Sequence, residues 1–312
     1  MKKFISFLLP VFFLLLSSSA QTTVAKTTDL AADNYKGKVK QVRQTYHEMI
    51  QKNGKDTIGQ EYQTESFNFL RNYNEAGFLT AETIYSRGST KSANSENKYD
   101  AEGNKIEEVT YLEDGTLDYK VVRKFSNRGF LMEEKRCTFD TQETPDKLVY
   151  EPDPVGKPVK VVWYDGEGEI LETRTYTYDG FGNCIQEDAV DANGKALRKV
   201  ICTFDSRHLV TARDIYNGDG SIQSKAKFQY EYRGKLSQEQ VFDNNGKLVE
   251  KNTFVYNENG DQTEWTSFDR TGFVAYKYTF TYEYDANGNW TSRIESNNGK
   301  AAYIKRREIT YY

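Results

Sequence analysis

The stretch YKYTFTYEYDANGN, from Tyr276 to Asn289, decides the fold of this 312-residue chain. Its aromatic side chains stand at every second position, with Lys, Thr and Glu between them. This period of two predicts a strand with one aromatic face and one wetted face, as in an antiparallel sheet that is buried on one side. Asp285 can then cap a turn with its side chain, and Gly288 can take a positive φ without a Cβ clash. The stretch therefore predicts a strand that ends in a tight corner.

The same corner recurs along the chain as an aromatic residue, Asp or Asn, two further residues and Gly. One set of glycines is spaced by about 26 residues, and a second set falls between its members. His208 stands midway in the one double gap, and His is among the residues enriched at positive φ. The first set is Gly77, Gly103, Gly129, Gly156, Gly182, Gly234, Gly260 and Gly288. The second set is Gly115, Gly168, Gly194, Gly220, Gly246, Gly272 and Gly299. Such phasing predicts tandem β-hairpins.

The regular carboxylates of these corners are interpreted as structural turn residues, each paired with the glycine that ends its corner. The clearest pairs are Asp100 with Gly103, Asp179 with Gly182, Asp191 with Gly194, Asp243 with Gly246, Asn257 with Gly260, and Asp285 with Gly288.

For residues 35–312 we predict an all-β fold, a long antiparallel hairpin-repeat meander that is irregular at 141–158, where four of the five prolines lie. About twenty strands exceed the ~10 that an open twisted sheet usually carries. No helix layer is predicted to cover the aromatic face. We therefore expect the sheet to curl around that face as a solenoid, a coiled ribbon or a partial shell, with each repeat supported by its neighbours.

The N-terminus predicts export. Residues 1–20 combine two lysines, an apolar run too short to span a bilayer and small residues before the bond after Ala20, which is typical of a signal peptide. Residues 21–34 are predicted to be a flexible leader. We expect an exported protein, periplasmic or secreted to the cell surface, with no membrane span after signal cleavage. The net charge of −4, with Lys and Glu interspersed, does not favour nucleic-acid binding.

Four stretches resemble the YD repeat of the Rhs superfamily: YTYDGFGN from Tyr176, YEYDANGN from Tyr282, KYDAEGN from Lys98 and FVYNENG from Phe254. The resemblance covers roughly residues 35–312. Large Rhs proteins fold such repeats into a strand-built shell around a C-terminal toxin. This chain ends in strand-like residues, so we expect no toxin function, and the likeness to short exported YD-repeat proteins of Bacteroidetes implies a cell-envelope location. Choline- or glucan-binding repeats are a less similar alternative, because their period is nearer twenty.

Three cysteines are present, Cys137, Cys184 and Cys202. If Asp191 faces Lys195 across its corner, Cys184 and Cys202 stand directly opposite each other on neighbouring strands. That arrangement would suit a disulfide in an exported chain. The alternative is a pair of reduced, half-buried cysteines, because a register can slip by one residue. Cys137 is expected to remain unpaired.

Nothing in the sequence predicts catalysis. The two histidines, His47 and His208, form no recognisable catalytic or metal-binding motif, so we expect no enzyme activity, no cofactor and no metal. We expect Trp163, Trp265 and Trp290 to pack inside the curl, although outward-facing rings could stack on sugars. The predicted function is a scaffold or protein-binding surface, with an unknown envelope protein or glycan as partner. The alternatives are a carbohydrate- or cell-wall-binding module and, more distantly, an unrecognised hydrolase.

Overall fold

A computed structural model describes residues 27–62, 67–86, 91–138 and 146–312. It contains one short helix, α1 (Asp29–Ala32), and 21 antiparallel strands in a single sheet. The strands are β1 (Val39–Lys52), β2 (Lys55–Glu61), β3 (Phe69–Tyr73), β4 (Leu79–Tyr85), β5 (Lys91–Tyr99), β6 (Lys105–Leu112), β7 (Leu117–Phe125), β8 (Leu131–Thr138), β9 (Asp146–Pro152), β10 (Pro158–Tyr164), β11 (Ile170–Tyr178), β12 (Cys184–Asp191), β13 (Ala196–Phe204), β14 (Val210–Asn217), β15 (Ile222–Tyr230), β16 (Leu236–Phe242), β17 (Leu248–Tyr256), β18 (Gln262–Phe268), β19 (Val274–Tyr284), β20 (Trp290–Asn297) and β21 (Lys300–Tyr311).

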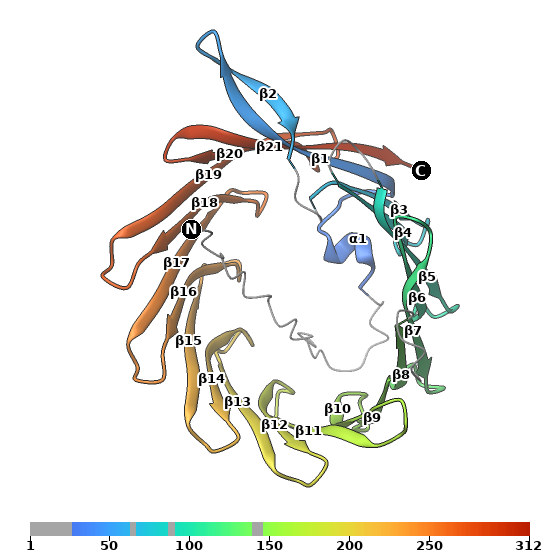
Figure 1. Ribbon diagram of the computed structural model, residues 1–312. Helices are drawn as coiled ribbons and strands as arrows, with labels where there is room; N and C mark the ends of the chain where they lie inside the picture. Colours follow the sequence, from blue (N-terminus) through green and yellow to red (C-terminus); the bar gives the residue numbers. More distant parts are fainter. Residues whose placement is uncertain (1–26, 63–66, 87–90, 139–145) are drawn as a thin grey trace.

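The sheet closes into a barrel. From β3 to β21 each strand pairs with the next, and β1 pairs with both β21 and β3. Only β2 stands outside this ring, so the ring holds 21 − 1 = 20 strands (Figure 1). The predicted solenoid, coiled ribbon or partial shell is therefore wrong, although the all-β antiparallel character is correct. An open array would leave two unpaired edge strands, and closure by the 14-residue β1 removes both.

The repeated corners have the same hydrogen bonds, whereas the corner at Gly299 is a two-residue turn between Asn297 and Lys300. In the corner after β11, the Gly182 amide donates to the Asp179 carbonyl, and the Asp179 amide donates to the Asn183 carbonyl. The Asp179 carboxylate accepts the amides of Phe181 and Asn183. Gly182 has a φ of 85°, and His208 fills the same position of its corner with a φ of 63°. A one-residue register shift accompanies each such corner, which is the signature of a bulge next to the turn.

The two sets of corners form the two rims of the barrel, and they pack differently. At the rim of the first glycine set, the residue that follows one glycine lies over the next corner, as Phe78 lies over Gly103 and Phe130 over Gly156. In the second set, Gly115, Gly168, Gly194, Gly220, Gly246, Gly272 and Gly299 have no described neighbour within 4 Å of a built Cβ. Figure 1 shows the first set nearer the barrel axis and the second set at the periphery. We call them the narrow rim and the wide rim.

A row of tyrosines ties neighbouring strands together near the narrow rim. Each hydroxyl donates to a backbone carbonyl 20 residues earlier in the chain, at the start of the adjacent strand. The pairs are Tyr99 with Leu79, Tyr178 with Pro158, Tyr230 with Val210, Tyr256 with Leu236 and Tyr282 with Gln262. This contact explains why an aromatic residue, and usually tyrosine, precedes so many of the narrow-rim corners.

The predicted flexible leader, residues 21–34, lies only partly within the described residues. Residues 1–26, with the predicted signal peptide, lie outside the described residues, but residues 27–34 form ordered structure on the inside of the wall (Figure 1). Thr28 caps α1, and Leu30 is buried in the apolar cluster of the barrel, with Tyr35, Val39, Val42, Phe69 and Tyr73. Burial of Leu30 in this cluster stabilises the position of residues 27–34 against the wall.

The proline-rich region 141–158 keeps the fold pattern where it is described. Residues 139–145, which include Pro145, lie outside the described residues. Pro152 and Pro158 end and begin strands, and Asp153–Gly156 forms a narrow-rim corner like the others. The irregularity is therefore accommodated at the ends of β9 and β10, where a missing amide donor interrupts no central ladder position.

Candidate binding surface

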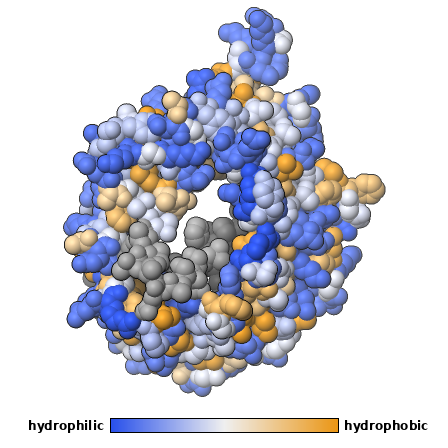
Figure 2. All heavy atoms as spheres, turned by 180° about the vertical axis from the view of Figure 1, so that it is seen from behind, coloured by the Kyte–Doolittle hydropathy of each residue, from blue (hydrophilic) through white to orange (hydrophobic). Residues whose placement is uncertain are grey.

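The inner wall of the barrel is identified by α1, which lies inside the ring (Figure 1) and whose segment contacts Arg71 and Tyr73. Cross-strand partners point to the same face of a sheet, so the pairing register assigns the other strands. Arg71 pairs with Glu82, and Trp265 pairs with Tyr278. The aromatic face is therefore the inner face, as the sequence predicted. Figure 2 shows an open space within the ring, and we call this space the lumen.

The two faces of the wall differ in the cation that forms most of their ion pairs, with Lys305–Glu295 as an exception on the inner face. Arginine pairs with glutamate on the inner face, in Arg71–Glu82, Arg123–Glu134, Arg136–Glu134, Arg174–Glu172, Arg198–Glu187 and Arg293–Glu295. Lysine pairs with acids on the outer face, in Lys98–Glu107, Lys120–Glu107, Lys124–Glu133, Lys199–Asp188, Lys225–Asp214 and Lys277–Glu264. The guanidinium group is more weakly hydrated and binds carboxylates in a planar fork, which suits the half-buried inner wall. The strongly hydrated ammonium group suits a face in water.

The inner wall holds a peptide segment of the same chain, residues 27–36, which we call the lumen segment. Its Asp29 carboxylate accepts hydrogen bonds from the Tyr99 hydroxyl and the Leu79 amide, both at 2.8 Å. Its Asp33 carboxylate accepts the Tyr73 hydroxyl at 2.7 Å and pairs with Arg71 at 3.2 Å. The wall thus binds two carboxylates, at the two ends of the short helix α1, through phenol, guanidinium and backbone donors.

The far end of the lumen segment reaches the corner after β19. The Lys36 amide donates to the Asn289 side chain at 2.8 Å, and the Asn289 side-chain amide donates to the Lys36 carbonyl at 2.8 Å. The Lys36 ammonium lies against Gly288 as the residue after each glycine does elsewhere on the narrow rim. Between β21 and β1 no corner connects the strands, and the lumen segment occupies that place in the narrow rim.

A buried charged cluster lies where β20, β21 and β1 meet. Glu295 pairs with Arg293 and, at 3.4 Å, with Lys305, and it accepts the Tyr46 hydroxyl at 3.1 Å. Lys305 is 9 % exposed, and its ammonium lies 4.1 Å from the centre of the Phe67 ring. Burial, together with the positive charge of Arg293, lowers the pKa of Lys305 to about 8 despite its contact with Glu295.

This lowered pKa predicts a pH dependence. Between about pH 8 and the ordinary value of 10.5, the unfolded chain holds a proton on Lys305 that the folded chain has released. The contribution of Lys305 to stability therefore rises with pH across this interval, by roughly 1 kcal/mol per pH unit and no more than ~1.4. We expect Lys305→Met to remove that slope, while Lys277→Met on the outer wall leaves it unchanged. Urea unfolding at several pH values measures both, and equal slopes in the two variants would contradict the assignment.

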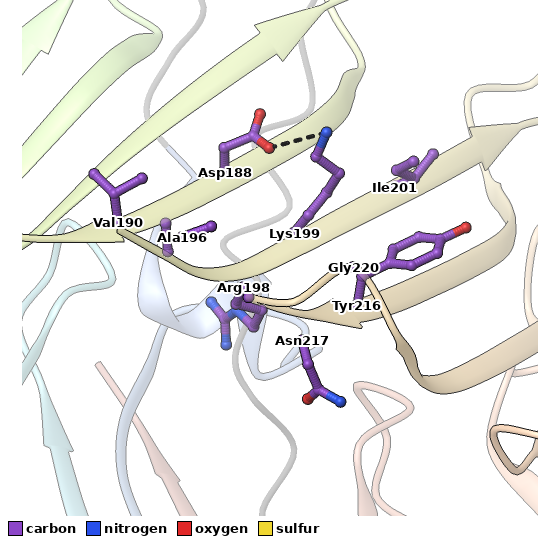
Figure 3. Close-up of a pocket in the computed structure, with 11 residues that line it drawn as sticks. Asp188, Val190, Ala196, Arg198, Lys199, Ile201, Tyr216, Asn217 and Gly220 are labelled. Carbon is purple, nitrogen blue, oxygen red and sulfur yellow. Dashed lines mark ion pairs between the residues drawn. The ribbon is translucent and has the colours of Figure 1, made fainter. Parts of the chain in front are cut away.

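A hollow of about 460 Å³ lies at the wide rim across β12, β13 and β14 (Figure 3). Its ion pair, Asp188 with Lys199 at 3.4 Å, points to one side of the strands, and Arg198 points to the other. Because these charged groups do not converge on one position, the hollow is a weaker binding candidate than the inner wall.

Gly218, in the corner that borders this hollow, is a point of forced contact. A Cβ built on Gly218 would lie 1.9 Å from the Ala196 carbonyl oxygen, whereas one built on Gly180, at the same position of its own corner, meets no described atom within 4 Å. We expect Gly218→Ala to lower the free energy of unfolding by about 1–3 kcal/mol, because the corner must move off β13. Gly180→Ala is the matched control and should change it by less than about 0.5 kcal/mol. Chemical denaturation measures the stability of both variants. Equal stabilities would show that a Cβ at position 218 does not collide with the Ala196 carbonyl.

The predicted turn residues Asp100, Asp179, Asp191, Asp243, Asn257 and Asp285 all lie in the corners at the rims. The corner at Asp285 is the one that contacts the lumen segment, through Gly288 and Asn289. The three tryptophans lie half-buried on the inner wall, where Trp265 stacks on Tyr278 and Trp290 packs under Arg307. Within the described residues, no group of three or more His, Cys, Asp or Glu side chains could hold a metal ion.

The predicted geometry of the cysteines is wrong. Gln186 pairs with Ile201 because a bulge at Ala189 and Val190 shifts the register by one, so Cys184 and Cys202 do not stand directly opposite. Both are free thiols here, as is Cys137. Burial raises the pKa of Cys184 to about 11 and also raises that of Cys202. A disulfide between them stays a prediction that mass spectrometry of unreduced peptides would test.

Sequence reasoning did not find the lumen segment or its contacts. The only feature of the sequence that could have indicated it is the spacing of Asp29 and Asp33, which are one helical turn apart and close to Leu30 and Tyr35. Arg71 and Tyr73 stand at alternate positions of β3, so the sequence places them on one face of the sheet. It does not predict which residue they contact.

No family model matches this chain, and no curated protein matches it. Among solved structures, a porin-like protein from Bacteroides uniformis is similar, with 13% identity and a TM-score of 0.36, over 87% of this chain and 98% of that one. A porin-like protein from Bacteroides vulgatus shows 9% identity and a TM-score of 0.30, over 88% and 98%. TcdB2-TccC3-TEV shows 13% identity and a TM-score of 0.30, over 84% of this chain and 19% of its own.

No function is transferred from these structures, because the identities and TM-scores are this low. Membership of the Rhs superfamily stays a prediction. Across the described ranges, no helix is long and apolar enough to cross a membrane.

Proposed function

We propose that this protein is an exported, non-catalytic scaffold of the cell envelope that binds polypeptide on the inner wall of its barrel. The observation that carries the proposal is the lumen segment, whose two aspartates are held by Tyr73, Tyr99 and Arg71. A wall that binds one peptide through paired carboxylates has the chemistry to bind another of the same kind. Export is supported by the sequence of residues 1–20, and mass spectrometry of the mature chain would test cleavage after Ala20.

The inner wall has more of this chemistry beyond the lumen segment. Arg213 lies over the Phe228 ring at 5.6 Å, and it forms no ion pair with any of the described residues. Arg174 on β11 and Arg198 on β13 lie on the same face, one strand apart, and each is paired with a glutamate. Guanidinium, carboxylate and aromatic groups that alternate along a concave wall favour a peptide that carries acidic and apolar side chains, as the lumen segment does with Asp29, Leu30 and Asp33.

A peptide with the sequence of residues 27–36 tests the proposal in trans. The full-length variant D29N/L30A/D33N lacks the side-chain contacts that hold the lumen segment against the wall, so its binding site is free. We expect a labelled peptide to bind this variant about tenfold more tightly than the wild type. The control peptide carries asparagine at both aspartate positions and should gain nothing. Fluorescence anisotropy measures the affinities, and equal binding of the two peptides, or of one peptide to both proteins, would refute peptide recognition by the inner wall.

A further inference from the structure

One position of the repeat forms a row around the inner wall, five residues after the residue that ends each narrow-rim corner. The nine members of this row are Glu82, Glu108, Glu134, Val161, Glu187, Arg213, Glu239, Trp265 and Arg293. Glutamate is the commonest residue in the row, and a cation stands there only at Arg213 and Arg293. Arg293 pairs with Glu295 two residues later, whereas Ile215 holds that place after Arg213. Arg213 therefore reverses the usual charge of the row without an acid of its own.

The neighbours of Arg213 do not supply that acid. Its partners across the strands are Cys202 on β13 and Ala226 on β15, a thiol and a methyl group. The members of the row on either side are Glu187 and Glu239, but within the described ranges neither forms an ion pair with Arg213. A half-buried guanidinium without an anion is partly stripped of water and is not compensated. Binding of a carboxylate would compensate it through charge-assisted hydrogen bonds.

The lumen segment shows what an arginine of this kind binds. Arg71 lies over the Phe69 ring at 4.4 Å, and it holds the Asp33 carboxylate of the lumen segment at 3.2 Å. Arg213 lies over the Phe228 ring in the same manner, on β14 and β15, across the ring of strands from β3 (Figure 1). An aromatic ring covers one face of a guanidinium group and leaves its N–H edge available to a carboxylate.

The repeat that carries Arg213 also departs from the others in its backbone. Among the nine narrow-rim corners, only this one ends in a residue other than glycine, and that residue, His208, has a φ of 63°. A positive φ at a residue with a Cβ is uncommon, and such conformations cluster at functional sites. One repeat thus departs from the pattern twice within six residues, which favours a specific role for this part of the wall.

We propose that Arg213 and Phe228 form a second carboxylate-binding site on the inner wall, which takes an aspartate or glutamate side chain of a peptide bound in the lumen. The inference rests on the proposed function and deepens it, because it names the residue that selects an acidic peptide where the lumen segment does not reach. Wild-type protein then retains one carboxylate site, at Arg213, while its own Asp33 occupies Arg71.

Reversal of the charge at position 213 tests the site in the full-length wild-type chain. R213E installs the glutamate that is the commonest residue of the row, so the variant is expected to fold, and its urea midpoint checks this. We expect R213E to weaken binding of the labelled peptide of residues 27–36 by about tenfold or more. K227E is the matched control, because Lys227 lies over the Phe242 ring at 5.7 Å on the outer wall of the neighbouring strand. It should leave the affinity unchanged.

A peptide of reversed charge supplies the complementary test. The same labelled peptide with lysine at both aspartate positions should bind R213E about tenfold more tightly than it binds the wild type. Fluorescence anisotropy measures every affinity in the series.

Four results would overturn the proposal. R213E could leave the affinity for the aspartate peptide unchanged, K227E could lower it by the same factor, or the lysine peptide could bind R213E and the wild type equally. The fourth is a wild type that binds no peptide while D29N/L30A/D33N does, because recognition then belongs to Arg71 alone. In each of these cases the gain of D29N/L30A/D33N over the wild type still reports on the proposed function, which fails separately if that gain is absent.

Discussion

Replacing Phe69 with alanine is expected to lower the free energy of unfolding by about 3–5 kcal/mol, the range for a large aromatic removed from a closed core. Phe69 is 5 % exposed and belongs to the cluster of buried apolar residues beside the lumen segment. It pairs with Gln44 of β1, so it stands at the junction where the first strand of the chain joins the ring. The Arg71 guanidinium lies over its ring at 4.4 Å and would lose that contact as well.

Urea unfolding followed by tryptophan fluorescence measures this loss. The control is Phe273→Ala, because Phe273 sits at a wide-rim corner and is 75 % exposed. That change should cost less than about 0.5 kcal/mol. Equal stability of the two variants would show that the cluster around Phe69 does not hold the junction.

Replacing Glu295 with glutamine is expected to cost about 3–5 kcal/mol, because it leaves Arg293 and Lys305 buried without their shared anion. Burial by itself would raise the pKa of Glu295, but the positive charges of Arg293 and Lys305 outweigh burial and hold that pKa below its usual range. The carboxylate therefore contributes stability that is present above the unfolded pKa and lost as the pH falls through the lowered folded value.

Two comparisons test this prediction. Glu264→Gln breaks the outer-wall pair with Lys277, at 2.9 Å, and should cost less than about 1 kcal/mol, because exposed pairs contribute little. The difference between wild type and Glu295→Gln should shrink as the pH falls through the lowered pKa of the wild-type carboxylate, where it takes up its proton. A difference that is independent of pH would mean that the glutamate acts through packing and not through its charge.

The corners and the strands could be predicted because both are local. Asp285 and Gly288 satisfy a turn within five residues, and the alternation from Tyr276 assigns faces without reference to any other strand. Closure could not be predicted, because it depends on whether twenty strands and their tilt match the circumference of a ring. Nothing in the sequence of β1 distinguishes a strand that ends an array from one that joins its two ends.

The candidate site was even harder to predict from the sequence than the closure of the barrel. The lumen segment is polar, and its burial depends on a wall built from residues 40 to 70 positions later. The register of Cys184 and Cys202 failed for a different reason: the bulge beside the corner at Gly194 adds one residue, and a count of residues across a corner cannot detect it.

The junction of β1 with β21 also constrains the order of folding. Apart from β1 with β3, which are separated by β2, every other pairing in the ring joins strands that are neighbours in the chain, so hairpins can form one after another at small entropic cost. The last pairing joins Val39 to Tyr311 and must wait until the whole array has assembled with the correct curvature. Until then the chain exposes two unpaired strand edges, which can pair with other chains. Closure of the barrel is therefore expected to be the slowest step of folding and the one most prone to aggregation.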